Sequence, residues 1–325
     1  MRVLSNMQFW QSPLWRTRTD SIYPAPEDAT GETAELGVWR QSGMLYRRRK
    51  QYDRVVTMGI RESMAYAALC AVTGQASRQV MTEVFVDQAQ PGSFSWKVKN
   101  RLYGWLARRA AGIITNSTAE IETTAQRFGV ERDRLTFIPL CPTRPPEVTE
   151  EVAPPYVLSA GRTLRDYALM WQVAERLDAP VVIICGQGDL PGRASTERIT
   201  IHREIDRARY LDLLRGSTVV ALPLLPTERS TGQVVFLEAM AMGKPVITTR
   251  APGTVDYVAH HRTGWLISTG DGEALYQACA TLLGDAELRR RLGEAALAWV
   301  RENGAPDQYA QRFLDAVKAF GRDEG

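Results

Sequence analysis

Short β-branched runs alternate with longer helical stretches twice along the chain, and this alternation constrains the fold more than any other feature. The first series predicts strands at Arg54–Met58, Gln79–Phe85, Gly112–Thr115 and Arg134–Pro139. The second series predicts strands at Tyr156–Ala160, Pro180–Cys185, Thr218–Pro223 and Lys244–Thr249. Helical stretches separate the strands within each series, which is typical of βα units that form a parallel sheet.

A proline-rich segment separates the two series. Cys141–Val157 holds five prolines among acidic residues and therefore cannot form a regular helix or a central strand. We predict an α/β protein with two βα domains, at residues 1–145 and 146–304, and a terminal helical segment at 305–325. Ligands of such sheets bind beyond the carboxyl ends of the strands, so the expected site is a cleft between the domains.

The composition is that of an ordinary globular protein, with 44% hydrophobic and 24% charged residues. The net charge of +3 is uneven: residues 1–150 carry 20 Lys and Arg against 15 Asp and Glu, and residues 151–325 carry 20 against 22. The basic excess in the first half predicts an anionic partner, either a phosphate-bearing acceptor or an anionic lipid surface. It is too small to indicate a nucleic-acid partner.

The cysteines and histidines show no metal-ligand spacing. The chain has four scattered cysteines, no CxxC pair and three histidines that do not complement them, which favours reduced thiols in a cytosolic protein. No apolar run reaches the roughly 18 residues that span a bilayer, and the first residues lack a signal-peptide layout. We therefore expect a cytoplasmic protein with no bound metal and no cofactor.

The segment from Ser230 to Pro245 is the best candidate for chemistry. Ser230, Thr231 and Gly232 place hydroxyls and backbone N–H groups at the start of a helix, where a phosphate can bind. Glu238, on the second turn, can accept two hydrogen bonds from a vicinal diol such as a ribose. A capped helix with one buried glutamate also occurs as plain structure, so the pattern alone leaves both interpretations open.

The run Leu237–Leu275, LEAMAMGKPVITTRAPGTVDYVAHHRTGWLISTGDGEAL, resembles the donor-binding half of glycosyltransferase family 4 in the GT-B superfamily. VLSAGR at Val157–Arg162 is similar to a strand-turn of that family, and Leu106–Pro139 resembles the end of its N-terminal domain. The resemblance covers about residues 50–320. It implies two Rossmann-like domains that face each other across a cleft, with the last helix, Pro306–Phe320, crossing back to the first domain.

The resemblance also implies roles for individual residues. Glu238 corresponds to the glutamate that holds the donor ribose, and Arg162 to the arginine that contacts the donor diphosphate. Arg165 stands near the place of a family lysine and either supplies a second cation or is a solvated turn residue. The rest of the expected donor-binding set is Gly161, Ser230, Thr231, Gly232, Gln233, Val234, Gly253 and Thr254.

The sequence departs from the family pattern in two places. Ser230 occupies the position of a second glutamate near the donor sugar, so either Glu228 reaches in from the loop or the hydroxyls of Ser230 and Thr231 replace the carboxylate. The N-terminal half shows neither the family's glycine-rich loop nor its histidine. Glu83 and Asp87 stand at the expected strand end instead, as candidate catalytic carboxylates.

The activity implied by the resemblance is transfer of a hexose from a UDP- or GDP-linked sugar to an acceptor hydroxyl, with retention of configuration. Such a reaction needs charge stabilisation at the phosphates more than a strong base. An inverting reaction would need a base, Asp87 or Glu83, with a raised carboxyl pKa. Because no Asp-x-Asp triplet occurs, we expect metal independence.

The expected acceptors belong to the synthesis of envelope polysaccharide, glycolipid or another glycoconjugate. Two alternatives remain, a nucleotide-sugar epimerase of the same fold and a non-catalytic subunit that binds a sugar nucleotide. Ser93–Arg109, SFSWKVKNRLYGWLARR, interleaves aromatic and basic residues, as does Arg47–Lys50 with its neighbours. We expect either a helix lying on an anionic leaflet, on the inner face of the membrane, or a domain helix with Trp105 and Leu106 in the core.

Overall fold

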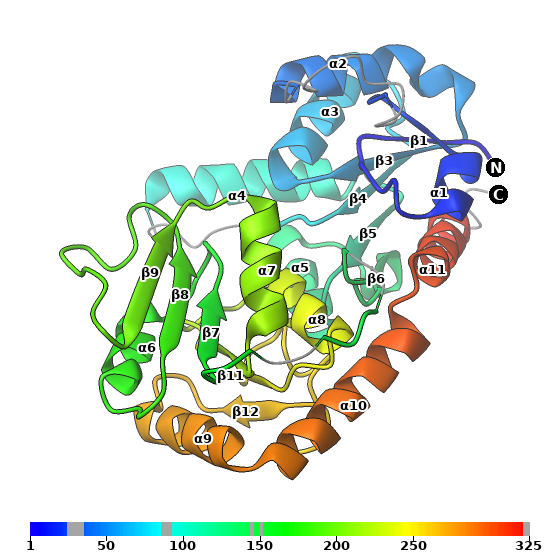
Figure 1. Ribbon diagram of the computed structural model, residues 1–325. Helices are drawn as coiled ribbons and strands as arrows, with labels where there is room; N and C mark the ends of the chain where they lie inside the picture. Colours follow the sequence, from blue (N-terminus) through cyan, green and yellow to red (C-terminus); the bar gives the residue numbers. More distant parts are fainter. Residues whose placement is uncertain (25–35, 86–92, 144–145, 150–151, 321–325) are drawn as a thin grey trace. The chain divides into compact units, whose positions relative to one another are not determined.

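The computed structural model describes residues 1–24, 36–85, 93–143, 146–149 and 152–320. The chain divides into two compact units (Figure 1). Unit 1 comprises Met1–Ile138 and Pro306–Gly325, and unit 2 comprises Pro139–Ala305. Within the described ranges each unit contains one six-stranded sheet whose paired strands are all parallel. Two Rossmann-like βα domains are therefore confirmed.

The sheet of unit 1 has the strand order β2-β1-β3-β4-β5-β6. Its strands are β1 Val3–Ser5, β2 Thr19–Ser21, β3 Arg54–Met58, β4 Gln79–Thr82, β5 Gly112–Thr115 and β6 Leu135–Phe137. Strands β3, β4, β5 and β6 match the predicted positions, because each contains a short apolar run. Strands β1 and β2 were not predicted, since three residues are too few to show a period.

The helices of unit 1 connect these strands and cover the sheet. They are α1 Pro13–Arg18, α2 Val38–Arg48, α3 Ile60–Val72, α4 Phe94–Ala107, α5 Thr118–Phe128 and α11 Pro306–Ala319. Two short 3-10 turns, η2 Arg49–Gln51 and η3 Arg132–Arg134, precede β3 and β6. The last helix, α11, packs on α1: the rings of Trp15 and Phe313 meet edge to face at 5.4 Å, and Ser12 Oγ donates to Asp307 Oδ1 at 2.5 Å.

The sheet of unit 2 has the strand order β12-β11-β10-β7-β8-β9. Its strands are β7 Val157–Ala160, β8 Val181–Cys185, β9 Ile199–Arg203, β10 Val219–Leu222, β11 Val246–Thr249 and β12 Trp265–Ile267. Its helices are α6 Tyr167–Ala174, α7 Arg207–Gly216, α8 Gln233–Ala241, α9 Gly272–Gly284 and α10 Ala286–Asn303. The core of the unit packs α6 and α9 against the buried side chains of β7, β8 and β10.

The boundary between the units precedes the position expected from the sequence. The chain joins unit 2 at Pro139 instead of residue 146. Leu140 N donates to the Tyr257 hydroxyl at 3.1 Å, and Glu147 N donates to the Ala241 carbonyl at 2.8 Å. The proline-rich segment therefore hydrogen-bonds along unit 2, because prolines prevent regular structure but leave the intervening N–H groups in need of acceptors.

Strand β4 is shorter than predicted, since it ends at Thr82 and not at Phe85. Glu83 has a φ of +53°, in the left-handed region, and this conformation ends the extended backbone.

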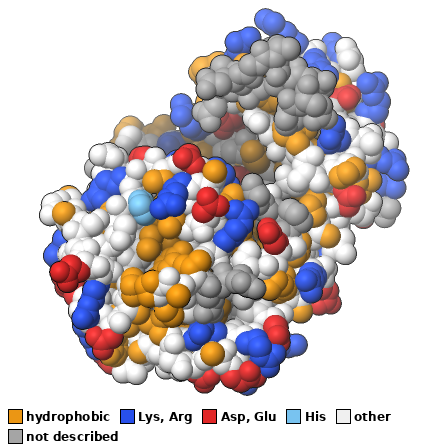
Figure 2. Space-filling view, viewed as in Figure 1, with side chains coloured by type: hydrophobic (Ala, Val, Ile, Leu, Met, Phe, Trp, Pro, Cys, Tyr) orange, Lys and Arg blue, Asp and Glu red, His pale blue; other side chains and the backbone are white. Residues whose placement is uncertain are grey.

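In the described part of the chain, no helix combines the length and the apolar composition needed to cross a membrane. On the face shown in Figure 2, basic and acidic side chains are interspersed, without a broad field of one sign among the residues described.

Candidate functional site

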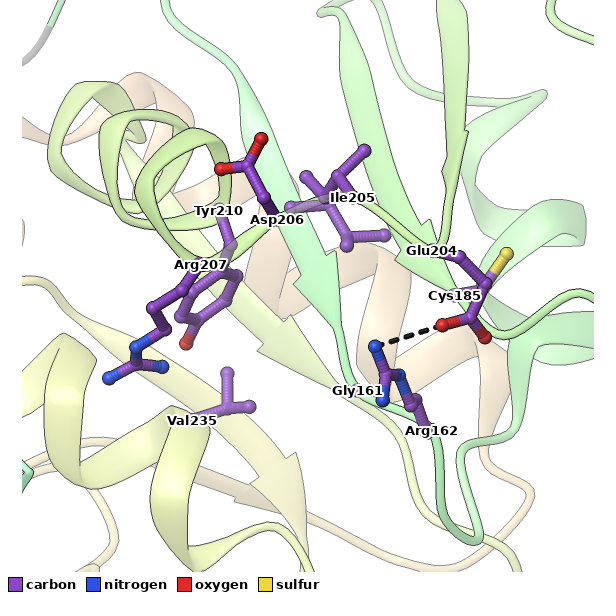
Figure 3. Close-up of a pocket in the computed structure, with 10 residues that line it drawn as sticks. Gly161, Arg162, Cys185, Glu204, Ile205, Asp206, Arg207, Tyr210 and Val235 are labelled. Atoms are coloured by element: carbon purple, nitrogen blue, oxygen red, sulfur yellow. Dashed lines mark ion pairs between the residues drawn. The ribbon is translucent and has the colours of Figure 1, made fainter. Parts of the chain in front are cut away.

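A cavity of about 240 Å³ opens within unit 2, at the carboxyl ends of β7 and β8 and the beginning of α7 (Figure 3). Parallel sheets bind their ligands at this edge. The lining residues are Gly161, Arg162, Ile184, Cys185, Glu204, Ile205, Asp206, Arg207, Tyr210 and Val235. Arg162 and Glu204 lie at one end, and Arg207 and Tyr210 lie together at the other, with Val235 below them (Figure 3). The cavity thus has two polar ends and apolar walls.

Gly161 forms the turn that leaves β7, and only glycine fits there. Its φ is +129°, and a Cβ atom on it would lie 2.4 Å from Nη2 of Arg165. The Tyr167 hydroxyl lies near the carbonyl oxygens of both Gly161 and Ile184, at 2.6 and 2.8 Å. These contacts hold the ends of β7 and β8 in place and shape the floor of the cavity.

Glu238 lies on α8 and its side chain is 1% exposed. Its Oε2 accepts hydrogen bonds from the Tyr210 hydroxyl at 2.8 Å and from Arg207 Nη1 at 3.2 Å. Its Oε1 accepts from Arg207 Nη2 and from Thr143 Oγ1. The carboxylate is therefore buried directly behind two side chains of the cavity wall, and its negative charge is balanced by the Arg207 guanidinium.

The surroundings of Glu238 change the acidity of its partners. Burial raises the pKa of the Tyr210 hydroxyl well above its usual value, and the nearby Glu238 carboxylate raises it further. Burial opposes the charge on Arg207, but the hydrogen bond and the attraction to Glu238 give it a raised pKa overall. Tyr210 therefore remains a hydrogen-bond donor and Arg207 remains a cation.

Arg162, at the other end of the cavity, forms an ion pair with Glu204. The Nη2 to Oε2 distance is 2.9 Å, and the two side chains are 68% and 44% exposed. An ion pair in contact with solvent contributes little to stability and exchanges its partners easily. Arg162 can therefore turn to an anionic ligand at small cost.

Arg165 is half-buried beneath the Gly161 turn. Its Nε donates to the Ala160 carbonyl at 2.9 Å, and its Nη1 donates to the Thr163 carbonyl at 2.7 Å and to Thr231 Oγ1 at 3.3 Å. Burial lowers the pKa of the guanidinium. Arg165 is thus held by hydrogen bonds within the protein, and it connects the β7 turn to the loop before α8.

The beginning of α8 is tightly packed. Gly232 is its N-cap, with a φ of +90°, and Ser230, Thr231 and Gln233 are buried while Val234 is 49% exposed. A Cβ atom on Gly253 would lie 2.6 Å from Gln233 Nε2. Nε2 is buried and has no hydrogen-bond partner among the residues described. An unused buried donor at a helix N-terminus is unusual and is chemically suited to an anionic ligand.

Thr254, in the turn after β11, has a structural contact. Its Oγ1 donates to the Thr249 carbonyl at 2.7 Å, and the Ala251 N–H donates to the same hydroxyl at 2.9 Å. These bonds are local and hold the turn that contains Gly253 in shape.

Known proteins resemble this chain in sequence over unit 2 and in fold over nearly its whole length. The family model described as Glycosyl transferases group 1 matches residues 155–285, from β7 to the end of α9. HepE of Anabaena, solved in complex with UDP and with UDP-glucose, superposes with TM-scores of 0.70 and 0.69 at 15% identity. The superposition covers 98% of this chain and 100% and 99% of HepE, which shows that the folds agree. Residues 155–285 thus resemble group 1 glycosyl transferases in sequence, and the whole chain shares the fold of HepE.

Curated proteins that resemble the chain match shorter stretches of it. N-acetyl-alpha-D-glucosaminyl L-malate synthase of Bacillus anthracis is 36% identical over 101 residues, 30% of this chain and 26% of the relative. A D-inositol 3-phosphate glycosyltransferase of Xylanimonas cellulosilytica is 25% identical over 236 residues, 62% of this chain and 55% of the relative. The chain therefore spans about half the length of these relatives or less.

The family 4-like motif does not point to Arg207 and Tyr210, and sequence reasoning missed both. They lie at positions i and i+3 of α7, a spacing that places side chains on one face of a helix. That spacing was the available signal, but α7 itself was not predicted. Only the packing of α7 beside α8 brings these residues to Glu238.

The candidate carboxylates of unit 1 follow β4. Glu83 is half-buried, and burial raises the pKa of its carboxyl, with a further rise from the nearby negative charge of Glu120. Asp87 lies outside the described residues. Elsewhere in the described chain, no group of three or more His, Cys, Asp or Glu side chains is arranged to hold a metal ion.

Proposed function

We propose that the chain transfers a sugar from a nucleotide-diphosphate sugar to an acceptor hydroxyl, in the synthesis of envelope polysaccharide, glycolipid or another glycoconjugate. The observation that supports this best is the cavity at the carboxyl ends of β7 and β8, with Glu238 buried behind its wall. The segment that forms it lies within the stretch matched by the group 1 glycosyl transferase model. HepE, which has the same fold, was solved with UDP-glucose, and this makes a UDP-linked sugar one candidate donor beside a GDP-linked one.

The size of the cavity suggests which part of the donor enters it. Whole ligands occupy pockets of roughly 300–1,000 Å³, and this cavity has about 240 Å³. We assign the nucleoside to it, with the ribose hydroxyls donating to Glu238 in exchange for Thr143 or one N–H group of Arg207. The phosphates and the sugar would then extend towards the beginning of α8.

The beginning of α8 suits a diphosphate. The helix N-terminus carries partial positive charge, Gln233 Nε2 supplies a buried donor, and Arg165 lies beside Thr231. Arg162 would supply a further cation for the diphosphate once its ion pair with Glu204 opens. The backbone N–H group of Gly232 is a further donor for the leaving group, whereas that of Thr254 already donates to the Ala251 carbonyl at 3.0 Å. The hydroxyls of Ser230 and Thr231 would face the sugar where the family has a glutamate.

We propose retention of configuration and independence of metal ions. Departure of the nucleotide diphosphate builds negative charge on its oxygens, which Arg162, Arg165 and the α8 N-terminus would stabilise. The leaving diphosphate would accept the proton of the incoming hydroxyl on the same face. If the reaction inverts instead, Glu83 is the described candidate for a base, because its raised pKa suits proton abstraction better than that of an exposed carboxyl.

We further propose that the protein acts in the cytoplasm, at the inner face of the membrane, where lipid-linked acceptors are found. Support comes from α4, whose sequence interleaves basic and aromatic residues and whose large apolar side chains are partly exposed.

Thermal unfolding with UDP- and GDP-sugars tests the donor site, since a ligand that binds the native state raises the Tm. We expect a rise with at least one of them, its reduction in Arg162→Gln, and its loss in Glu238→Ala. Glu302→Ala, an exposed change on α10, is the control. No rise with any nucleotide sugar would contradict the proposal.

An acceptor assay distinguishes the alternatives. Sugar transfer to an acceptor supports the main proposal. Binding without turnover would favour a non-catalytic subunit, and interconversion of the donor sugar without transfer would favour an epimerase.

A further inference from the structure

A second cavity, of about 500 Å³, lies in unit 1 at the amino-terminal edge of its sheet. Residues that immediately precede β4, β5 and β6 line it, together with the last turns of α11. Substrates of parallel sheets bind at the opposite, carboxyl edge, where Glu83 lies. This second cavity is therefore separate from the expected acceptor site, and nothing in the proposed transfer reaction uses it.

Four arginines and one acidic residue line this cavity, and they give it a net positive charge. The arginines are Arg78, Arg108, Arg109 and Arg134, and the acidic residue is Asp133. Within the described ranges, none of the four arginines forms an ion pair with a carboxylate. Clustered guanidinium groups without carboxylate partners repel one another, so an anion in this cavity would relieve the repulsion.

Hydrogen bonds to the backbone hold three of these arginines in place. Arg108 Nη1 donates to the Phe128 carbonyl at 2.7 Å, Arg134 Nη1 donates to the Arg108 carbonyl at 3.2 Å, and Arg78 Nη1 donates to the Tyr52 carbonyl at 3.2 Å. A guanidinium has five N–H donors, so these bonds leave most of them for a ligand. The cations are therefore positioned before any ligand arrives, which reduces the entropic cost of binding.

One wall of the cavity is apolar. Phe320 lines it, and a Cβ atom on Gly112 would lie 2.4 Å from the Phe320 ring, so the ring rests directly on the first residue of β5. Two alanines of α11, Ala316 and Ala319, continue this wall. A ligand suited to such a cavity has an anionic group for the guanidiniums and an apolar part beside it.

Helix α4 carries an exposed apolar face that leads to this cavity. Its members recur every three or four residues: Phe94 is 83% exposed, Val98 51%, Leu102 50% and Trp105 45%. The next residue, Leu106, is only 2% exposed, so Leu106 packs in the core of the unit and Trp105 does not. The Arg109 guanidinium lies 5.1 Å from the centre of the Trp105 ring, which joins the apolar face to the arginines.

We propose that the arginine cavity binds the phosphate headgroup of an anionic phospholipid, while the exposed face of α4 enters the acyl boundary of the same leaflet. The charge of the cavity, its apolar wall and the adjoining helix face match the chemistry of a lipid and not that of a free anion. This inference rests on the membrane contact proposed above and does not depend on the donor chemistry.

Flotation with vesicles tests the cavity. Arg78→Gln with Arg109→Gln removes two cavity charges, and Arg40→Gln with Arg61→Gln removes two exposed charges from α2 and α3. Diffuse attraction to an anionic surface depends on charge number, so it would weaken both double variants equally. We expect the cavity pair to lose about tenfold more partitioning than the control pair on vesicles with phosphatidylglycerol, with little binding of any form to phosphatidylcholine alone. Equal losses would overturn the proposal.

A second pair of variants identifies the source of the phosphate. Val98→Ser with Leu102→Ser removes exposed apolar groups, and we expect it to lower partitioning by about tenfold or more. If this variant partitions as the wild type does, while inorganic phosphate raises the Tm of the wild type and not of the arginine pair, the ligand is a soluble phosphate and the lipid assignment is wrong. The Tm shift with nucleotide sugar, measured on every variant, should be unchanged, so failure here is distinct from failure of the donor proposal.

Discussion

The Tyr210 hydroxyl donates a 2.8 Å hydrogen bond to Glu238 Oε2, joining α7 to α8 inside unit 2. Tyr210 is 9% exposed and Glu238 is 1% exposed, so water does not replace this bond when it is broken. Because α7 begins at the cavity and α8 begins at the proposed phosphate site, the pair fixes the position of one relative to the other. The stability of the unit and the shape of the donor site therefore depend on the same contact.

Replacing Tyr210 with Phe removes the donor and leaves part of a buried carboxylate unsatisfied. Hydrogen bonds to charged groups contribute about 1.5–3 kcal/mol, so we expect the free energy of unfolding to fall by about that amount. Urea denaturation of the wild type and Tyr210→Phe measures it. Tyr276→Phe, on α9, is the matched control and should change stability by less than about 0.5 kcal/mol. Equal effects of the two would show that the Tyr210 bond contributes nothing.

Arg207 and Glu238 should be energetically coupled. Removing one member of a buried pair costs about 3–5 kcal/mol, but the Arg207 side chain is 47% exposed, so we expect about 2 kcal/mol for Arg207→Met. In Arg207→Met with Glu238→Gln the uncompensated charge disappears, and the loss should be smaller than the sum of the single losses by about 1 kcal/mol or more. Urea denaturation of the four proteins measures this coupling. Additive losses would mean that the ion pair is not formed in solution.

Gly161→Ala should damage both the fold and the donor site. The alanine would have to adopt a φ near +129°, and its Cβ atom would lie 2.4 Å from Arg165 Nη2. We expect this strain to cost about 2 kcal/mol or more. Gly188→Ala, in the next loop, is the control, because its Cβ would have no atom within 4 Å. Thermal unfolding with and without nucleotide sugar measures both effects. An unchanged Tm for Gly161→Ala would contradict this account of the turn.

The pH dependence of stability should reveal the raised pKa of the Glu83 carboxyl. Burial, and then Glu120, raises its pKa in the folded state, so the folded protein binds the proton more tightly than the unfolded chain. The contribution of this carboxyl to stability is fully present below the pKa of the unfolded chain, near 4.3, and is lost as pH rises through the pKa of the folded protein. Glu83→Gln should therefore become more stable than the wild type as pH rises from about 4 to 7. Urea denaturation across this range measures the difference, and Glu131→Gln, exposed on the same unit, should show none.

The elements predicted from the sequence are those whose signal is local. Strand β3 at Arg54–Met58 and helix α8 after Gly232 follow directly from a short apolar run and a glycine that begins a helix. The predicted end of β4 was wrong because no local sequence pattern indicates the left-handed conformation of Glu83. Arg207 lies 31 residues before Glu238, and its role depends on how two helices pack, which no local pattern encodes. The segment that carries the family motif was therefore predictable, whereas the partners of its glutamate were not.

Gln233 allows function to be separated from stability. Its buried Nε2 has no partner within the part of the chain that the structure describes, so replacing the amide with the similarly sized Met removes an unsatisfied donor and should leave the Tm nearly unchanged. If the donor diphosphate accepts a hydrogen bond from Nε2, the variant loses about 1.5–3 kcal/mol of binding, or roughly ten- to a hundredfold in Kd. Val234→Ala, the exposed neighbour on α8, is the control and should keep its affinity. Titration calorimetry with the nucleotide sugar that gives the largest Tm shift measures these affinities, and an unchanged Kd for Gln233→Met would remove the beginning of α8 from the phosphate site.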